Sequence, residues 1–418
     1  MLNVKRLNIA KAYIFLIGFF STFQILEIAG VNVFSILVWL YVSVKIIKDC
    51  KKYYKLDKWI LAFFISIIIS EIMIFTIPLN NKIEWEISSI KKLFILLGIF
   101  LFYICLRKDK TNKINVFFKG VYISCWLQVI WCYMQFAILK VLGININSVL
   151  FNSSQFNLQG EHVLTGLTVN AGILGVSILF VCVFAKSILV KIMAVAICFV
   201  AGSSTLIICG ILIILGECYL FFKNYIKKQK IKISKKKILF FIAGGILLLI
   251  ILCFNNSLYT RISNIFNGLI KRLGNVHNQE FVDGSTYTHS RYYTSVMHVL
   301  KNLKWYNVLW GFGLGCAGVP FVYIFEQYPD EIYVPESDYI TFLYNFGIVG
   351  IFIILSLFIR IIYKGSKISN RYSLFMVILM ILGIFYGMQL NWVLLVEFLL
   401  LDYIKKDINL LDVLHSKN

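Results

Sequence analysis

The stretch Trp59–Pro78 reads WILAFFISIIISEIMIFTIP and carries a single charged side chain, Glu71. A helix of about 20 apolar residues is long enough to cross the hydrocarbon core of a bilayer. The length and composition of this stretch therefore predict a transmembrane helix. Similar runs recur along the chain, and together they decide the fold class.

Twelve runs of this kind are predicted to span the membrane. They lie at about 12–29, 32–48, 59–78, 92–106, 115–137, 164–185, 188–202, 204–222, 238–254, 339–361, 373–388 and 390–404. Several of them are short, which leaves eleven spans or one re-entrant segment as alternatives.

The composition agrees with a membrane protein. Of 418 residues, 60% are hydrophobic and only 15% are charged, whereas soluble domains are about 45–50% apolar and about 25% charged. This excludes a soluble enzyme, a nucleic-acid-binding domain, a disordered chain and a secreted disulfide scaffold. Long apolar runs also exclude a β-barrel, whose alternating strands give a weaker signal. We predict an all-α polytopic membrane protein.

The basic residues, which give the chain a net charge of +21, are distributed unevenly between the two sides of the predicted topology. With the N-terminus in the cytoplasm, 30 Lys and Arg residues fall on the cytoplasmic side and 10 on the outer side. This asymmetry is the positive-inside pattern, and it places both termini in the cytoplasm. The basic excess is thus topological and predicts no nucleic-acid partner. We expect a multi-pass protein of a bacterial cytoplasmic membrane, surrounded by membrane lipid.

Two connections on the predicted outer side are long, and they divide the chain. Residues 1–254 hold nine spans and the first long loop at 138–163, residues 255–338 form the second, and residues 339–418 hold three spans and a cytoplasmic tail. Long loops in compact proteins are usually functional. Apolar residues at helical spacing predict amphipathic helices at 258–273 and 291–303 within the second loop.

The end of the second loop carries an ordered set of motifs. Arg291 is followed by WGFGLG at 310–315, by ESDY at 336–339 and by FGIVG at 346–350 in the next span. The glycines of the first motif either allow close approach of two backbones or bind a phosphate. Asp338 either caps the next helix or takes part in chemistry.

This order of motifs, with about twelve spans and a large late outer loop, resembles the Wzy-type O-antigen and capsular polysaccharide polymerases and the related O-antigen ligases. The resemblance implies a GT-C-like membrane fold. Ligases typically place a histidine where the late loop meets the next helix, whereas this chain has Ser337-Asp338. This difference favours a polymerase over a ligase.

The resemblance implies glycosyl transfer on the outer face of the membrane, in the synthesis of O-antigen, capsule or exopolysaccharide. The donor would be a glycan on polyprenyl pyrophosphate and the acceptor a hydroxyl of a second lipid-linked repeat unit. It also implies a flippase and chain-length regulators as partners. No acidic pair suited to a metal is found, and we expect no metal and no cofactor.

Two chemical demands select the candidate site residues. A fixed cation must stabilise the leaving pyrophosphate, and a base must take the proton of the acceptor hydroxyl. Arg291 is the first candidate for the cation, because a guanidinium binds phosphate through two hydrogen bonds and keeps its charge. Asp338 and Glu161 lead for the base. Further candidates for binding or catalysis are Gly311, Gly313, Gly315, His162, Arg261, Arg272, Lys304, His289, His298 and Glu336.

A transporter or lipid-linked oligosaccharide flippase is the alternative from a different class. Four glutamates within predicted spans support this alternative. Charged side chains inside a membrane are costly, so their presence there indicates a function. These residues are Glu27, Glu71, Glu217 and Glu397. A large outer loop and the lack of an internal repeat count against this alternative.

Overall fold

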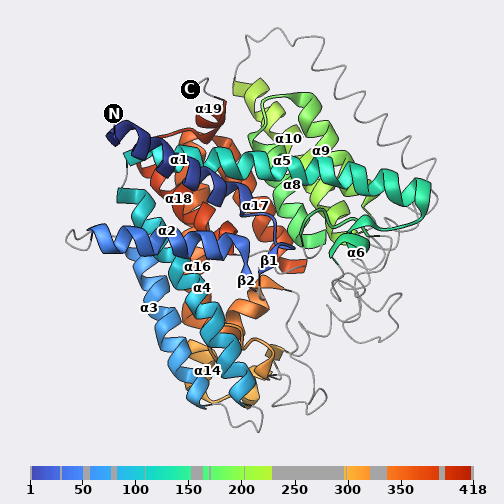
Figure 1. Ribbon diagram of the computed structural model, residues 1–418. Coiled ribbons are helices and arrows are strands. Elements are labelled where there is room, and N and C mark those ends of the chain that lie inside the picture. The colour runs from blue at the N-terminus through green and yellow to red at the C-terminus, as the bar shows by residue number, and fades with distance from the viewer. Residues whose placement is uncertain are drawn as a thin grey trace, which may run out of the picture.

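The computed structural model describes most of the predicted spans and part of the second outer loop. The described residues are 2–28, 31–49, 57–76, 82–108, 110–151, 163–168, 171–201, 203–227, 296–297, 299–320, 337–385 and 391–415. Among these residues the chain is almost entirely helical (Figure 1), which confirms the all-α prediction. Within the described ranges, five helices are long and apolar enough to cross a membrane.

Helices occupy eleven of the twelve predicted runs, and the run 238–254 lies outside the described residues. The helices of the first half are α1 (Leu2–Phe20), α2 (Val33–Asp49), α3 (Lys58–Met73), α4 (Lys82–Lys108), α5 (Lys110–Leu142) and α6 (Ile146–Phe151), with the 3-10 helix η1 (Ile74–Thr76) after α3. Those that follow are α8 (Ala171–Phe184), α9 (Ile188–Val200), α10 (Ser204–Lys227), α14 (Trp305–Trp310), α16 (Asp338–Ile368), α17 (Asn370–Phe385), α18 (Asn391–Lys405) and α19 (Leu410–Leu414).

The first predicted span ends earlier than its apolar run. Helix α1 stops at Phe20, and the chain forms a short hairpin from β1 (Glu27–Ile28) and β2 (Val31–Asn32) before α2 begins. Asn32 stabilises this reversal, because its side chain donates to Phe23 O and accepts from Phe34 N. Glu27 is exposed in this hairpin, so it does not lie inside a helix.

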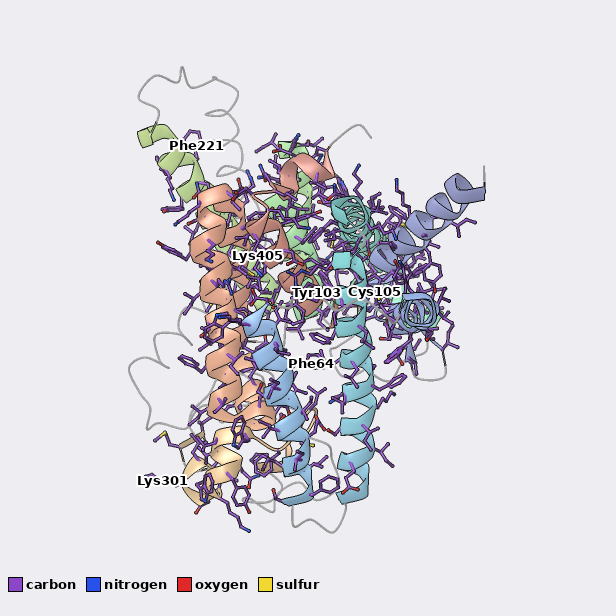
Figure 2. All side chains as sticks on the ribbon, turned by 90° about the vertical axis from the view of Figure 1, so that its left-hand side faces the viewer. Phe64, Tyr103, Cys105, Phe221, Lys301 and Lys405 are labelled. Carbon is purple, nitrogen blue, oxygen red and sulfur yellow. The ribbon has the colours of Figure 1, made fainter. Side chains whose placement is uncertain are left out.

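The helices form two sets that cross each other. Helices α3, α4 and α16 run side by side along one direction, whereas α1, α2 and α5 run across them (Figures 1 and 2). Figure 2 places Lys405 towards one end of the first set, Lys301 at the other end and Phe64 between them. The two sets do not share one axis, so the count of twelve spans and the GT-C-like arrangement remain predictions.

Two packed pairs, one from each set, run in the relative directions that the predicted alternation requires. Helices α1 and α5 run parallel, because Gly18 lies against Phe117 and Val121 while Thr22 lies further along against Ser124. Their backbones approach closely where glycines remove the side chain, which is typical of helix pairs in membranes.

Helices α3 and α16 run antiparallel. The start of α3 meets the end of α16 through Asp57 and Arg360, and the Phe63 ring meets the Phe346 ring further along. These directions are those expected of an outward and an inward span.

A continuous apolar core joins the two sets. Helix α8 lies at its centre and is buried along its whole length. Large buried rings fill the space between the helices, among them Phe180, Tyr103 and Trp392. This core fixes the ends of the helices relative to one another, and the polar groups gather at those ends.

Candidate functional site

The glycines of the WGFGLG motif form a turn, residues 311–315, that packs on the first part of α16. Phe312 N donates to Tyr344 O at 2.8 Å, and Gly313 N donates to Asn345 O at 3.1 Å. Gly311, Gly313 and Gly315 all have positive φ angles, a region that residues with a Cβ rarely adopt. The glycines therefore have a conformational role in this turn, which we call the glycine turn.

The glycine turn and α16 interlock at two glycines. A Cβ at Gly311 would lie 2.3 Å from Asn345 O, and a Cβ at Gly347 would lie 2.2 Å from Leu309 O. Gly347 also has non-helical dihedral angles (φ 65°, ψ −170°) and kinks α16 at this point. The FGIVG and WGFGLG motifs therefore meet in space.

Glu71 of α3 joins the glycine turn to two further helices. Its carboxylate accepts from Leu314 N at 2.7 Å and from the Ser89 hydroxyl of α4. A Cβ at Gly313 would lie 3.5 Å from Glu71 Oε2. This carboxylate therefore links α3 and α4 to the glycine turn.

Lys92 of α4 is a cation at the glycine turn. A Cβ at Gly315 would lie 2.8 Å from Lys92 Nζ, so the end of the lysine side chain packs against this glycine. Lys92 is exposed, and it forms no ion pair with the described residues. Cys316, which follows, is neutral at physiological pH because burial, together with the nearby Glu71 carboxylate, raises its pKa to about 12.

Asn345 leaves one hydrogen-bond acceptor open beside the turn. Its side chain is 5% exposed, and Oδ1 has no hydrogen-bond partner among the described residues. A buried acceptor without a donor costs about 1–3 kcal/mol.

The structure places two other predicted site residues near the same ends of the helices. Asp338 is the first residue of α16 and is buried against α17, where a Cβ at Gly383 would lie 2.9 Å from its Oδ2. Lys304 precedes α14, with Nζ 5.8 Å from the centre of the Tyr306 ring. Neither placement tests a catalytic role.

The sequence predicts a helix at 291–303. Within the described part of this stretch, residues 296–297 and 299–302 are helical. Val299 is fully buried and packs with Ala317, Ile340 and Tyr344. The end of the second outer loop is thus docked on the start of α16.

The end of the first outer loop is fixed by a buried network of amides. Gln135 Oε1 accepts from Gly166 N at 2.9 Å, and Gln128 Oε1 accepts from Leu167 N at 2.6 Å. Asn147 Nδ2 donates to Thr165 Oγ1 at 3.1 Å. Helix α8 begins only after this turn, seven residues later than the predicted span at 164.

Eight of the predicted site residues lie outside the described residues. They are Glu161, His162, Arg261, Arg272, His289, Arg291, His298 and Glu336. The roles of these eight residues remain predictions. Of the other candidates, the structure brings Gly311, Gly313 and Gly315 together with the start of α16.

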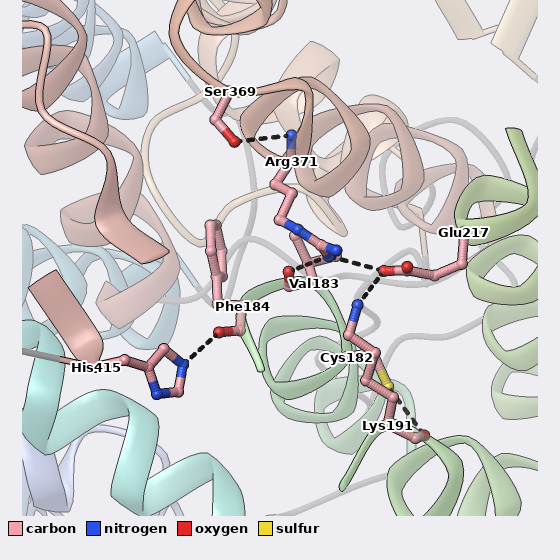
Figure 3. Close-up of polar contacts among 8 residues, drawn as sticks. All are labelled: Cys182, Val183, Phe184, Lys191, Glu217, Ser369, Arg371 and His415. Atoms are coloured by element: carbon pink, nitrogen blue, oxygen red, sulfur yellow. Dashed lines mark hydrogen bonds and ion pairs between the residues drawn. The ribbon is translucent and has the colours of Figure 1, made fainter. Parts of the chain in front are cut away.

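The partly buried Glu217 belongs to an ion triad at the predicted cytoplasmic end (Figure 3). Its Oε1 lies 2.6 Å from Lys191 Nζ and 2.8 Å from Arg371 Nη1. Arg371 also donates to Val183 O at 2.6 Å. The triad joins α9, α10 and α17, so the negative charge of Glu217 is paired with two cations.

Sequence reasoning missed the contacts of Glu71, Ser89 and Lys92 with the glycine turn. Two signals were available: a lone glutamate in an apolar helix, and lysines at the start of the following helix. Nothing in the sequence links either of them to a turn more than 200 residues later.

Within the described residues, no three His, Cys, Asp or Glu side chains are placed to hold a metal ion. Comparison of the chain with protein families, with curated proteins and with solved structures found no match.

Proposed function

We propose that this protein is a polysaccharide polymerase that joins polyprenyl-pyrophosphate-linked repeat units on the outer face of the cytoplasmic membrane. The order of Arg291, WGFGLG, ESDY and FGIVG at the end of a large outer loop carries this proposal. The packing of the glycine turn on α16 supports it, because this packing makes one unit of two motifs that are 30 residues apart.

In the proposed reaction, the anomeric carbon of the donor repeat unit loses its bond to the pyrophosphate oxygen. It forms a bond to the acceptor oxygen, whose proton passes to a base. Asp338, Glu161, Glu336, His289 and His298 remain the candidates for that base. Arg291 would stabilise the charge of the leaving pyrophosphate, and the product stays on the acceptor's lipid.

The region around the glycine turn offers groups suited to such substrates. Lys92 is an exposed cation beside the turn, and an ammonium group attracts a pyrophosphate as a point charge. Asn345 Oδ1 is a second polar group beside the turn, buried and without a hydrogen-bond partner among the described residues. The assignment of these groups to substrate is part of the proposal.

A flippase or transporter is the weaker candidate. Among the glutamates that motivated it, Glu27 is exposed in a hairpin, Glu71 is bonded to the glycine turn and Glu217 is paired with two cations. A transporter still predicts that these carboxylates matter more than the second outer loop. A ligase differs from the polymerase in its acceptor, and only the product distinguishes the two.

Surface glycan length in cells tests the proposal. Cells that lack the gene receive the wild type, Arg291→Ala or Lys140→Ala, the last as a control that removes an outer cation of α5. We expect long chains with the wild type and with Lys140→Ala. We expect single repeat units on the surface with the deletion and with Arg291→Ala at normal protein level. Repeat units that stay on the cytoplasmic face of the deletion strain would instead assign the protein to lipid-linked sugar transport.

A further inference from the structure

A second polar region lies at the opposite end of α3, α4 and α16 from the glycine turn. A cavity of about 730 Å³ opens there between the start of α3 and the ends of α4, α16 and α18. Its described lining includes five basic residues and one acidic residue, Asp57. The five basic residues are Lys58, Arg107, Arg360, Lys364 and Lys405.

Asp57 neutralises only part of this charge. Its carboxylate lies 3.1 Å from Arg360 Nη1 and 2.6 Å from Lys405 Nζ, and its side chain is 3% exposed. Arg107 is paired separately, with Asp402 behind the lining. Lys58 and Lys364 are exposed and form no ion pair with the described residues.

Arg360 offers unused donors to the cavity. Within the described part of the chain, its Nη1 donates to Asp57 Oδ1 at 3.2 Å and lies 3.1 Å from Asp57 Oδ2, and no contact is found for its other nitrogens. A guanidinium has five N–H donors in a planar fork that matches phosphate oxygens. Converging cations repel one another unless an anion lies between them.

One side of the cavity is apolar and aromatic. Trp59, Ile359 and Tyr363 belong to its lining, and Ile359 and Tyr363 are largely exposed on α16. A ligand with a charged head and a hydrocarbon part would contact both kinds of surface. Basic pockets between transmembrane helices on the cytoplasmic side bind anionic lipid head groups for this reason.

We propose that this cavity is a binding site for a phosphate-bearing anion, supplied by the head group of an anionic membrane phospholipid. The site lies at the predicted cytoplasmic ends of the helices and is separate from the proposed transfer site on the outer side. The bound phosphate would hold the ends of α3, α4, α16 and α18 together, because the basic residues at these ends otherwise repel one another.

Binding to the purified, delipidated full chain in detergent tests the proposal. The probes are phosphatidylglycerol, zwitterionic phosphatidylcholine and inorganic phosphate, and native mass spectrometry counts the bound molecules. The test variant is Lys58→Gln/Lys364→Gln. The matched control is Lys186→Gln/Lys406→Gln, which removes two exposed lysines that do not line the cavity.

We expect phosphatidylglycerol to bind the test variant about 30-fold more weakly than the wild type, and the control to bind as the wild type does. Asp57→Asn removes the acidic residue of the lining and should tighten binding severalfold, an effect that loss of folding cannot mimic. Competition by inorganic phosphate at equal concentration would identify free phosphate as the ligand. Equal weakening in the test and control variants, or in neither, would overturn the proposal.

Discussion

Gly347 shows how one residue determines the candidate site. Its backbone adopts a positive φ, and the carbonyl oxygen of Leu309 fills the space where a Cβ would lie. The residue therefore combines a conformational requirement with a steric one. Because the carbonyl belongs to backbone, it cannot move aside as a flexible side chain would.

We predict that Gly347→Ala lowers the free energy of unfolding by about 3 kcal/mol or more, through backbone strain and overlap together. Gly143→Ala is the matched control, since Gly143 also has a positive φ but no atom lies within 4 Å of the place that its Cβ would take. That control should cost only about 1 kcal/mol. Thermal unfolding of both variants in detergent measures the difference, and equal effects would contradict the packing of the glycine turn on α16.

Asp57 gives a prediction that depends on pH. Burial alone would raise its pKa, but hydrogen bonds from Lys405 and from Trp59 N, with the nearby charges, lower it below the ordinary value. A depressed pKa means that the ionised carboxylate stabilises the folded protein. The stabilisation is complete above the ordinary pKa and is lost as the pH falls through the lowered one.

We therefore expect Asp57→Asn to destabilise the protein by about 2 kcal/mol at pH 7. The difference from the wild type should stay constant down to about pH 5 and shrink below about pH 4. Unfolding midpoints across this pH range measure it. A difference that grows as the pH falls would show that the carboxylate is not stabilising in its ionised form.

At the scale of the element, ion pairs connect neighbouring helices, whereas the apolar pattern of the sequence only locates each helix. The triad of Lys191, Glu217 and Arg371 connects α9, α10 and α17 where these helices end. Glu217 is the centre of the triad, because both cations bond to the same carboxylate oxygen. Loss of the carboxylate leaves two cations without their partner, whereas loss of Lys191 leaves one ion pair intact.

We predict that Glu217→Gln costs about 2 kcal/mol, the size of a hydrogen bond to a charged group, since Glu217 and Arg371 each remain 24% exposed, and that Lys191→Met costs less. Lys223→Met serves as a control, since Lys223 lies on the same helix as Glu217 and, among the described residues, hydrogen-bonds to the neutral Asn370 and not to the triad. Unfolding in detergent gives the order of the three effects. A larger loss for Lys191→Met would show that Glu217 is not the shared partner.

Helix positions could be predicted from the sequence better than helix ends. Apolar length alone located every described helix from α2 to α5 and from α16 to α18. It failed at residues 21–28 and 164–168, where Asn32 and the amides of Gln128 and Gln135 stabilise turns inside apolar runs. Such turns depend on hydrogen bonds between distant segments, which hydropathy does not register.

The candidate site was predictable only in part for the same reason. Spacing of glycines identified the turn at 311–315, but its partners Glu71, Ser89 and Lys92 come from helices more than 200 residues away. A single sequence gives no information on which helices are neighbours. The predicted roles of Arg291 and of the histidines depend on a family resemblance.

At the scale of the whole molecule, the two polar regions lie at opposite ends of α3, α4 and α16 (Figure 2). The glycine turn lies at one end, and the basic cavity lies at the other. The predicted topology places the first outside the cell membrane and the second in the cytoplasm. This arrangement would separate glycan chemistry from the binding of a lipid head group.

Labelling of single cysteines in intact cells tests this orientation. We expect Lys304→Cys to react with a membrane-impermeant maleimide without permeabilisation, and Lys364→Cys to react only after it. Both lysines are exposed, and labelling of the parent protein corrects for the native cysteines. The reverse pattern would invert the topology and exclude an outer transfer site.

Elongation of lipid-linked glycans is the activity on which the proposed function depends. The most direct test reconstitutes the purified protein in vesicles with polyprenyl-pyrophosphate-linked repeat units and no nucleotide sugar. We predict glycans of two or more units, with one polyprenyl pyrophosphate released for each linkage formed and none with Arg291→Ala. Movement of repeat units between the leaflets without elongation would contradict the proposed function.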